Sequence, residues 1–140
     1  AHVKMYTGDD FNFPELIAGD AQGYSHALLG IFDPLAVAVG KAIRQLGQED
    51  VDGFRTTLDP TVPMARLMFR APTQHYKTGI VFLAWLNGHQ DHFVMLGGGQ
   101  AMRPLPYFVE CFKMADENGL LAQPDLAVAR MKRLLSVYGL

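Results

Sequence analysis

The sequence predicts a mainly α-helical chain that begins with two short strand–helix units. Two apolar segments near the start, residues 3–7 and 23–30, are bounded by glycine and acidic residues, as strands commonly are. About five later segments repeat apolar residues at the spacing of one helix face. Hydrophobic residues make up 49% of the 140 positions and charged residues 19%, which is enough apolar material for the core of one domain.

The first strand is predicted over residues 3–7, where apolar and polar side chains alternate until Gly8-Asp9-Asp10. A short helix over residues 13–18 should follow, with Pro14 in its first turn and Gly19 at its end. Residues 23–30 are interpreted as a second strand, although their pattern is also compatible with a helical turn.

A long helix is then predicted from Asp33-Pro34 to Gly47, with Asp33 as the capping residue and Pro34 in the first turn. It should bury one apolar stripe, formed by Leu35, Val39, Ile43 and Leu46.

Helical periodicity continues beyond this point. A helix from Glu49 is expected to break at Pro60 and Pro63 before its apolar pattern resumes. Gly97-Gly98-Gly99 is interpreted as a flexible connector, and Gly119 should separate the last two helices. The remaining helices are predicted over residues 73–87, 106–118 and 124–140.

Composition restricts the class of function. The formal charge of -2 disfavours a nucleic-acid partner, and the longest apolar run, residues 80–86, is far short of the ~20 residues that span a bilayer. Cys111 is the single cysteine and no signal peptide is visible, which favours a reducing, cytoplasmic setting. The chain begins Ala1-His2-Val3 without a methionine, so we expect it to be a fragment of a longer protein.

Two strands cannot by themselves form a parallel sheet that is buried on both faces. The predicted strands therefore lack neighbours. Either the chain pairs with copies of itself, or it is the C-terminal part of a larger α/β protein, which is the simpler interpretation.

Candidate substrate-binding residues lie on and just after the predicted strands. Asp9 and Asp10 follow the first strand and precede a helix, where α/β proteins place carboxylates that orient substrates or transfer protons. A structural alternative is that they cap the turn and the helix. Ser25 and His26 lie in the second strand, where alternation would direct only one of them to a given face, and a core role is the alternative.

Other chemically reactive residues favour structural interpretations. His89, Asp91 and His92 are spaced unlike a helical metal-binding pair, so a solvated loop is favoured over a zinc or iron site. Lys77 is expected to reach the surface, and Cys111 is expected in the core. No metal or cofactor is predicted.

The chain resembles the end of the dihydrodipicolinate synthase and N-acetylneuraminate lyase superfamily, which are Schiff-base aldolases on TIM barrels. The segments that resemble it are Tyr6-Thr7-Gly8-Asp9-Asp10, Gly23-Tyr24-Ser25-His26, Asp33-Pro34, Ala71-Pro72-Thr73-Gln74-His75-Tyr76-Lys77 and Leu105-Pro106. Gly8-Asp9-Asp10-Phe11-Asn12 and Gly88-His89-Gln90-Asp91-His92-Phe93 are similar to an uncharacterised dihydrodipicolinate-synthase-like branch.

The resemblance implies an α/β parentage for this mainly α chain. Residues 1–46 would be the last two βα units of a TIM (β/α)8 barrel, and residues 47–140 its C-terminal helical extension. Asp9, Asp10 and either Ser25 or His26 would lie near the barrel mouth as substrate-binding residues. The family's Schiff-base lysine and catalytic tyrosine belong to earlier strands and have no counterpart here, and Lys77 matches a helical lysine of the extension. No catalytic residue is therefore expected in this chain.

The leading functional hypothesis is the C-terminal portion of a Schiff-base lyase or aldolase that acts on a pyruvate-like keto acid. Alone it should be inactive, because that chemistry needs an amine nucleophile. The alternative is a noncatalytic helical module that self-associates through residues 80–86. Both hypotheses include a homo-oligomer in the cytoplasm.

Overall fold

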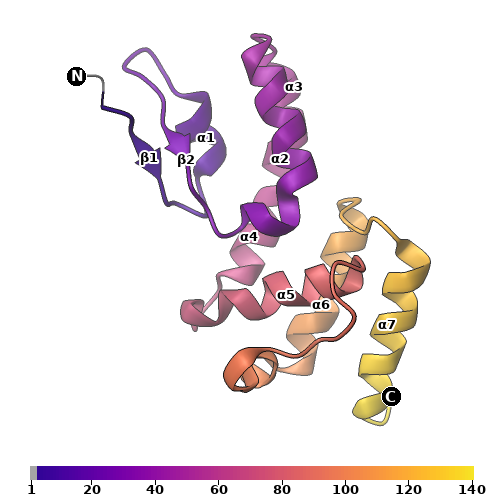
Figure 1. Ribbon diagram of the computed structural model, residues 1–140. Coiled ribbons are helices and arrows are strands. Elements are labelled where there is room, and N and C mark those ends of the chain that lie inside the picture. Colours follow the sequence, from indigo (N-terminus) through magenta and orange to yellow (C-terminus); the bar gives the residue numbers. More distant parts are fainter. Residues whose placement is uncertain (1–2) are drawn as a thin grey trace. The chain divides into compact units, whose positions relative to one another are not determined.

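The computed structural model describes residues 3–140 and confirms a mostly helical chain with few strands (Figure 1). The first compact unit ends at Leu67, and the second runs from Met68 to Leu140. The predicted division after residue 46, into the last two βα units of a barrel and a helical extension, stays a prediction. In the described part of the chain, every helix is too short or too polar to cross a membrane.

The elements of the first unit are β1 (Tyr6–Thr7), α1 (Phe13–Ala18), β2 (His26–Ala27), α2 (Phe32–Gly47), α3 (Val51–Leu58), the 3-10 turn η1 (Asp59–Thr61) and most of α4 (Val62–Met68). Those of the second are η2 (Thr73–His75), α5 (Tyr76–Leu86), η3 (Leu96–Met102), α6 (Leu105–Glu117) and α7 (Pro124–Val137).

β1 and β2 form a two-stranded parallel sheet in which Tyr6 pairs with His26 and Thr7 with Ala27. The predicted strand type is therefore confirmed, but each strand is two residues long and shorter than the predicted segment. A strand extends only as far as its partner does, and in the described chain each strand has a partner on one edge only.

Helix α1 connects the two strands and begins and ends where the sequence predicts. Pro14 lies in its first turn, and Gly19 ends it with a φ of 73°. A Cβ atom at Gly19 would lie 2.4 Å from the carbonyl oxygen of Gly23, so only glycine fits where the chain turns back toward β2.

The start of α2 differs from the prediction. Ile31 occupies the capping position, and the Asp33 side chain makes no capping hydrogen bond but lies in the first turn. The Phe32 N–H donates to the carbonyl of Leu29, which begins the helical turn before Asp33 is reached. Asp33 remains favourable there, because a carboxylate near a helix N-terminus interacts well with the helix dipole.

The predicted buried stripe of α2 is buried only in part. Leu35 is buried, Val39 and Leu46 are half-buried, and Ile43 is 44% exposed. Ala42 is buried instead, on the side of α2 that packs against α3. The prediction was wrong for Ile43, because this part of the helix lines a cleft rather than a closed core.

The predicted proline break is confirmed after α3. The Asp50 side chain caps α3 by accepting a hydrogen bond of 2.8 Å from the Gly53 N–H. The 3-10 turn η1 then contains Pro60 and leads into α4.

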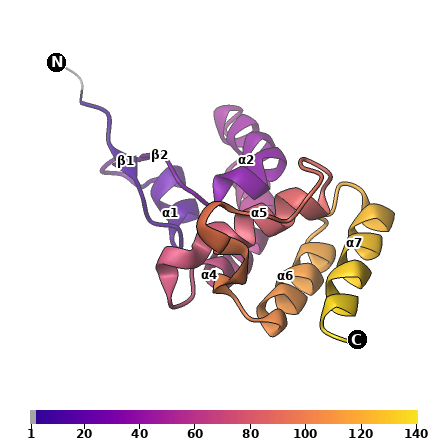
Figure 2. The same ribbon diagram turned by 60° about the horizontal axis from the view of Figure 1, so that its bottom comes forward.

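In the second unit, α5 is packed against both α6 and α7 (Figure 2). Its side chains Phe82, Leu83 and Leu86 are fully buried, as its almost continuous apolar sequence predicts. The rings of Phe82, Trp85, Phe93 and Phe108 form a cluster with centroid separations of 4.9 to 6.1 Å.

The triple-glycine segment is more structured than the predicted connector. It forms the 3-10 turns of η3, with Gly97 and Gly98 at φ values of 64° and 73°. The Thr78 hydroxyl on α5 donates a hydrogen bond of 2.8 Å to the carbonyl of Gly99. This bond ties the turn to the core helix.

Candidate functional site at the ends of the parallel strands

Asp9 follows β1 and organises the turn in which it lies. Its carboxylate accepts hydrogen bonds from the Phe11 N–H at 2.8 Å, the Asn12 N–H at 3.0 Å and the Asn12 side-chain amide at 2.8 Å. These bonds, first that from the Asn12 side chain and then that from the Phe11 N–H, hold the pKa of Asp9 below its usual value. The geometry favours the turn-capping interpretation for this residue.

Asp10 connects the ends of both strands. One oxygen of its carboxylate, Oδ1, accepts a hydrogen bond of 3.2 Å from the Ile31 N–H in the loop after β2. Partial burial raises the pKa of Asp10, the hydrogen bond from Ile31 opposes that shift, and the neighbouring Asp9 adds to it. Within residues 3–140, its Oδ2 accepts no hydrogen bond. Asp10 is thus the carboxylate at this edge with a free acceptor for a ligand.

Ser25 and His26 do not join these carboxylates. Both line a cleft between β2 and α2, whose lining residues include neither aspartate. The His26 ring lies 5.2 Å from the ring of Tyr6 and 5.5 Å from that of Tyr24, measured between centroids. The four predicted substrate-binding residues therefore divide into two places within the first unit. Sequence alternation predicted different faces for Ser25 and His26, but both border the same cleft.

Within residues 3–140, neither the lysine amines nor the cysteine thiol is in an environment that would activate it as a nucleophile. All five lysines of the chain have exposed side chains, including Lys77 on α5. The Cys111 thiol is fully buried, and burial raises its pKa to about 12, so it stays protonated and unreactive at neutral pH. The predicted surface position of Lys77 and core position of Cys111 are both confirmed.

His89, Asp91 and His92 lie in the segment after α5. All three residues are exposed. Residues 3–140 contain no group of three His, Cys, Asp or Glu side chains placed to hold a metal ion. The loop interpretation therefore accounts for these residues.

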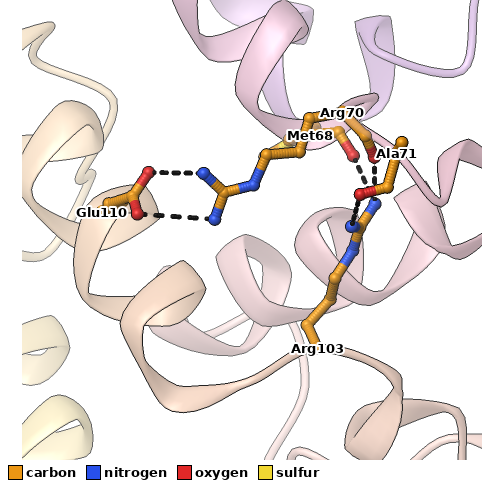
Figure 3. A network of polar contacts seen from close by, with 5 residues as sticks. All are labelled: Met68, Arg70, Ala71, Arg103 and Glu110. Carbon is orange, nitrogen blue, oxygen red and sulfur yellow. Dashed lines mark hydrogen bonds and ion pairs between the residues drawn. The ribbon is translucent and has the colours of Figure 1, made fainter.

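A second polar arrangement, in the second unit, was missed by sequence reasoning. Arg103 is 5% exposed, and its guanidinium donates to the carbonyls of Met68 at 3.2 Å, Arg70 at 2.8 Å, Ala71 at 3.3 Å and Pro72 at 3.1 Å. Figure 3 shows three of these carbonyl oxygens converging on Arg103, while the Arg70 side chain faces Glu110. A cation here satisfies the free carbonyls where α4 ends.

Arg130 satisfies backbone carbonyls at the end of α5 and just after it in the same way. Its guanidinium donates to the carbonyls of Trp85 and Gln90, the latter at 2.8 Å, and the residue is 9% exposed. Sequence reasoning did not identify this buried position. The available signal was its spacing from Ala127 and Leu134, which places it on the apolar face of α7.

Comparison with known proteins identifies the family. The family model described as "Protein of unknown function (DUF993)" matches residues 1–140. None of the curated proteins matches the chain. Since the match extends over the whole sequence, the chain belongs to the DUF993 family.

Proposed function

We propose that this chain is the C-terminal part of a dihydrodipicolinate-synthase-like lyase or aldolase that acts on a pyruvate-like keto acid. The observation that carries the proposal is the parallel pairing of β1 and β2 through a helical crossover, with an acidic loop at the end of β1. Parallel strands occur almost only in larger sheets whose two faces are covered. Enzymes built on such barrels gather their functional groups at the carboxyl ends of the strands.

Asp10 is the proposed substrate-binding residue of this edge. Its Oδ2 is available to accept a hydrogen bond from a substrate hydroxyl, and its Oδ1 is held by the Ile31 N–H. Asp9 stabilises the loop by accepting hydrogen bonds from the backbone N–H groups of Phe11 and Asn12. Ser25 and His26 belong to the cleft instead, so the proposal gives them no contact with the same substrate.

The amine nucleophile of such a reaction must come from outside residues 3–140. An imine-forming lysine needs a desolvated or cationic environment that lowers its pKa, and the five lysines here are exposed. The proposal therefore includes inactivity of this chain alone.

Trapping with pyruvate and borohydride tests this assignment. The 15.5 kDa chain should keep its mass after incubation with both reagents, as measured by intact mass spectrometry. A longer protein that contains these residues should gain a pyruvate adduct on a lysine that peptide mapping finds outside them. An adduct on Lys77, or the absence of any adduct in the longer protein, would contradict the lyase assignment.

Self-association is the second candidate function, and one observation favours it. Val3, Met5 and Leu28 around the two strands are 81%, 64% and 81% exposed, which is unusual for apolar residues beside a sheet. Residues 80–86 support it less, because α5 is covered by α6 and α7 of its own chain. Light scattering over a range of concentrations tests this candidate, since a monomer at all concentrations would contradict it.

The cytoplasmic setting and the homo-oligomer belong to the same proposal. A single, buried, unpaired cysteine supports a reducing compartment.

A further inference from the structure

Two asparagine–glycine pairs end helices of the second unit in the same backbone motif. Asn87-Gly88 follows α5 and Asn118-Gly119 follows α6, with asparagine φ values of -85° and -98° and glycine φ values of 77° and 64°. In both pairs the glycine N–H donates to the carbonyl three residues earlier, and the next N–H donates to the carbonyl five residues earlier. Asparagine followed by glycine is the sequence most prone to deamidation, because glycine has no Cβ to hinder attack by its backbone nitrogen.

The Asn87 side chain is held at both ends. It is 8% exposed, its amide nitrogen Nδ2 donates to the carbonyl of Leu120 at 3.0 Å, and its Oδ1 accepts from the Ala122 N–H at 2.8 Å. A Cβ atom at Gly88 would lie 3.1 Å from the side chain of Leu126, so little free space surrounds this glycine. A reaction at Asn87 therefore requires the loss of two hydrogen bonds to a distant loop.

The Asn118 side chain is half-buried, and its hydrogen bond is local. Nδ2 donates to the carbonyl of Met114 in the same helix at 2.7 Å, and within residues 3–140 its Oδ1 accepts no hydrogen bond. Gly119 is exposed, and a Cβ atom built there would meet nothing within 4 Å. Because helix ends fray, opening the last turn of α6 is enough to free both the side-chain amide and the Gly119 N–H.

From this contrast, we propose that Asn118 is a site of spontaneous deamidation in the folded chain and that Asn87 is protected. The Gly119 nitrogen loses its proton to hydroxide and bonds to Cγ of Asn118, and the bond from Cγ to Nδ2 breaks. The departing nitrogen takes up a proton from water and leaves as ammonia. Water then opens the cyclic imide, at Cγ to give aspartate or at the backbone carbonyl to give isoaspartate, so one water is consumed and one ammonia is released.

Isoaspartate would alter the connection between α6 and α7. It carries the main chain through its own Cβ and Cγ, which lengthens the backbone within the turn that the bond from the Leu120 N–H to the Ala115 carbonyl closes at 2.8 Å. Its new carboxylate follows Asp116 and Glu117 at the C-terminus of α6, where the helix dipole disfavours negative charge. Modification should therefore open this turn and weaken the contact of Leu120 with Asn87. The inference is independent of the lyase assignment.

The test is prolonged incubation of the 140-residue chain in mildly alkaline buffer, followed by trypsin digestion and peptide mapping. Trypsin places the two asparagines in separate peptides, residues 78–113 and 114–130, each with one asparagine. Asn118 should gain about 1 Da at least tenfold faster than Asn87, because Asn87 must lose more hydrogen bonds. An isoaspartyl methyltransferase with a labelled methyl donor should label only peptide 114–130.

The chain unfolded in urea is the control for sequence effects. There both asparagines should react at rates within about threefold of each other, because the protecting hydrogen bonds of Asn87 are absent. Asn118→Gln keeps a side-chain amide but closes the larger ring far more slowly, so its peptide should keep its mass.

Hydrogen exchange measures the structural consequence. The Leu120 amide should exchange at least tenfold faster in the isoaspartate-containing fraction than in the unmodified chain. Asn118→Asp introduces the charge without the longer backbone and should cause a smaller acceleration. In Asn118→Gln the rate should stay constant during the incubation.

Four results would overturn the inference. Asn87 could react as fast as Asn118 in the folded chain, or Asn118 could keep its mass there while it reacts in urea. A difference of the same size in urea would show that sequence alone controls the two rates. Equal Leu120 exchange in the modified and unmodified chains would contradict the opening of the turn.

Discussion

The two compact units bury their apolar residues in different ways. In the second unit, the most apolar helix, α5, is surrounded by α6 and α7, and buried arginines satisfy the carbonyls at two helix ends. In the first unit, the strands leave Met5 and Leu28 exposed, and the stripe of α2 borders a cleft. The second unit completes its own core, whereas the first presents surfaces that a further structural element would cover.

Because of this difference, we expect the two units to tolerate amino-acid substitutions to different degrees. Substitutions in the second unit act on a finished core, so they should cost the full energy of the contacts that are lost. Substitutions at the open surfaces of the first unit should cost little in the isolated chain and much more once those surfaces are covered.

The largest effect is expected for Arg103→Ala. The change leaves four carbonyls without their common donor and should lower the free energy of unfolding by about 3 kcal/mol. Urea unfolding followed by the fluorescence of Trp85, the single tryptophan, measures it. Arg133→Ala is the control, since Arg133 is exposed and should change stability by less than about 0.5 kcal/mol.

Gly79→Ala should cause the next largest loss in the free energy of unfolding. A Cβ atom there would lie 2.2 Å from the hydroxyl oxygen of the buried Tyr107, so about 2 kcal/mol should be lost. Tyr107→Phe in the same chain should restore more than half of it in urea unfolding. Gly40→Ala, also within a helix but with ordinary space, should be neutral or stabilising. An uncompensated double variant would contradict this account.

Hydrogen exchange compares the units directly. The amides of His26 and Leu28 in the sheet should exchange at least tenfold faster than that of Phe82 in α5, because the small sheet has an uncovered edge. Equal protection of the two regions would mean that the first unit is as complete as the second.

Asp10→Ala should lower the free energy of opening of the first unit, as measured by hydrogen exchange, by about 1 kcal/mol. The reason is that the Ile31 N–H loses its acceptor at the start of α2. Exchange of the Leu28 amide measures the loss, and the Trp85 transition should not move. Asp10→Asn keeps an acceptor oxygen and should retain most of the protection.

The smallest effect is in the pH dependence of the first unit. The pKa of Asp9 is lowered in the folded chain, so its contribution to stability is present above about pH 4 and is lost as the pH falls below that value. The pKa of Asp10 is raised, so its effect has the opposite sign, and stability falls as the pH rises through the same region. Hydrogen exchange of the His26 amide between pH 3 and 6 measures these changes in stability, which we expect to be about 0.5 kcal/mol. Asp9→Asn should make the stability of the first unit less sensitive to acid. Asp10→Asn should make it more sensitive.

Local signals were sufficient for most helices. Pro14 and Gly19 bound α1 as predicted, the prolines after α3 produce the break, and Gly119 separates α6 from α7. Each of these features depends on backbone conformations that a residue and its close neighbours determine.

The candidate site was predicted less completely. Asp9 and Asp10 were identified, but not that Asp9 bonds within its own turn while Asp10 reaches Ile31, twenty-one residues further along the chain. Arg103 carried no pattern that would identify it as buried, because its four acceptors are backbone carbonyls 31 to 35 residues earlier in the sequence.

The sequence by itself determined the helical class, the turn chemistry and the apolar character of α5, because these follow from local backbone preferences and periodicity. Only the tertiary structure decided which charged groups are buried and which apolar stripe stays open. Arg103 and Arg130 are buried because distant carbonyls converge on them, and Ile43 stays 44% exposed where α2 borders the cleft. Burial and pairing depend on contacts between residues far apart in the chain, and no local pattern contains that information.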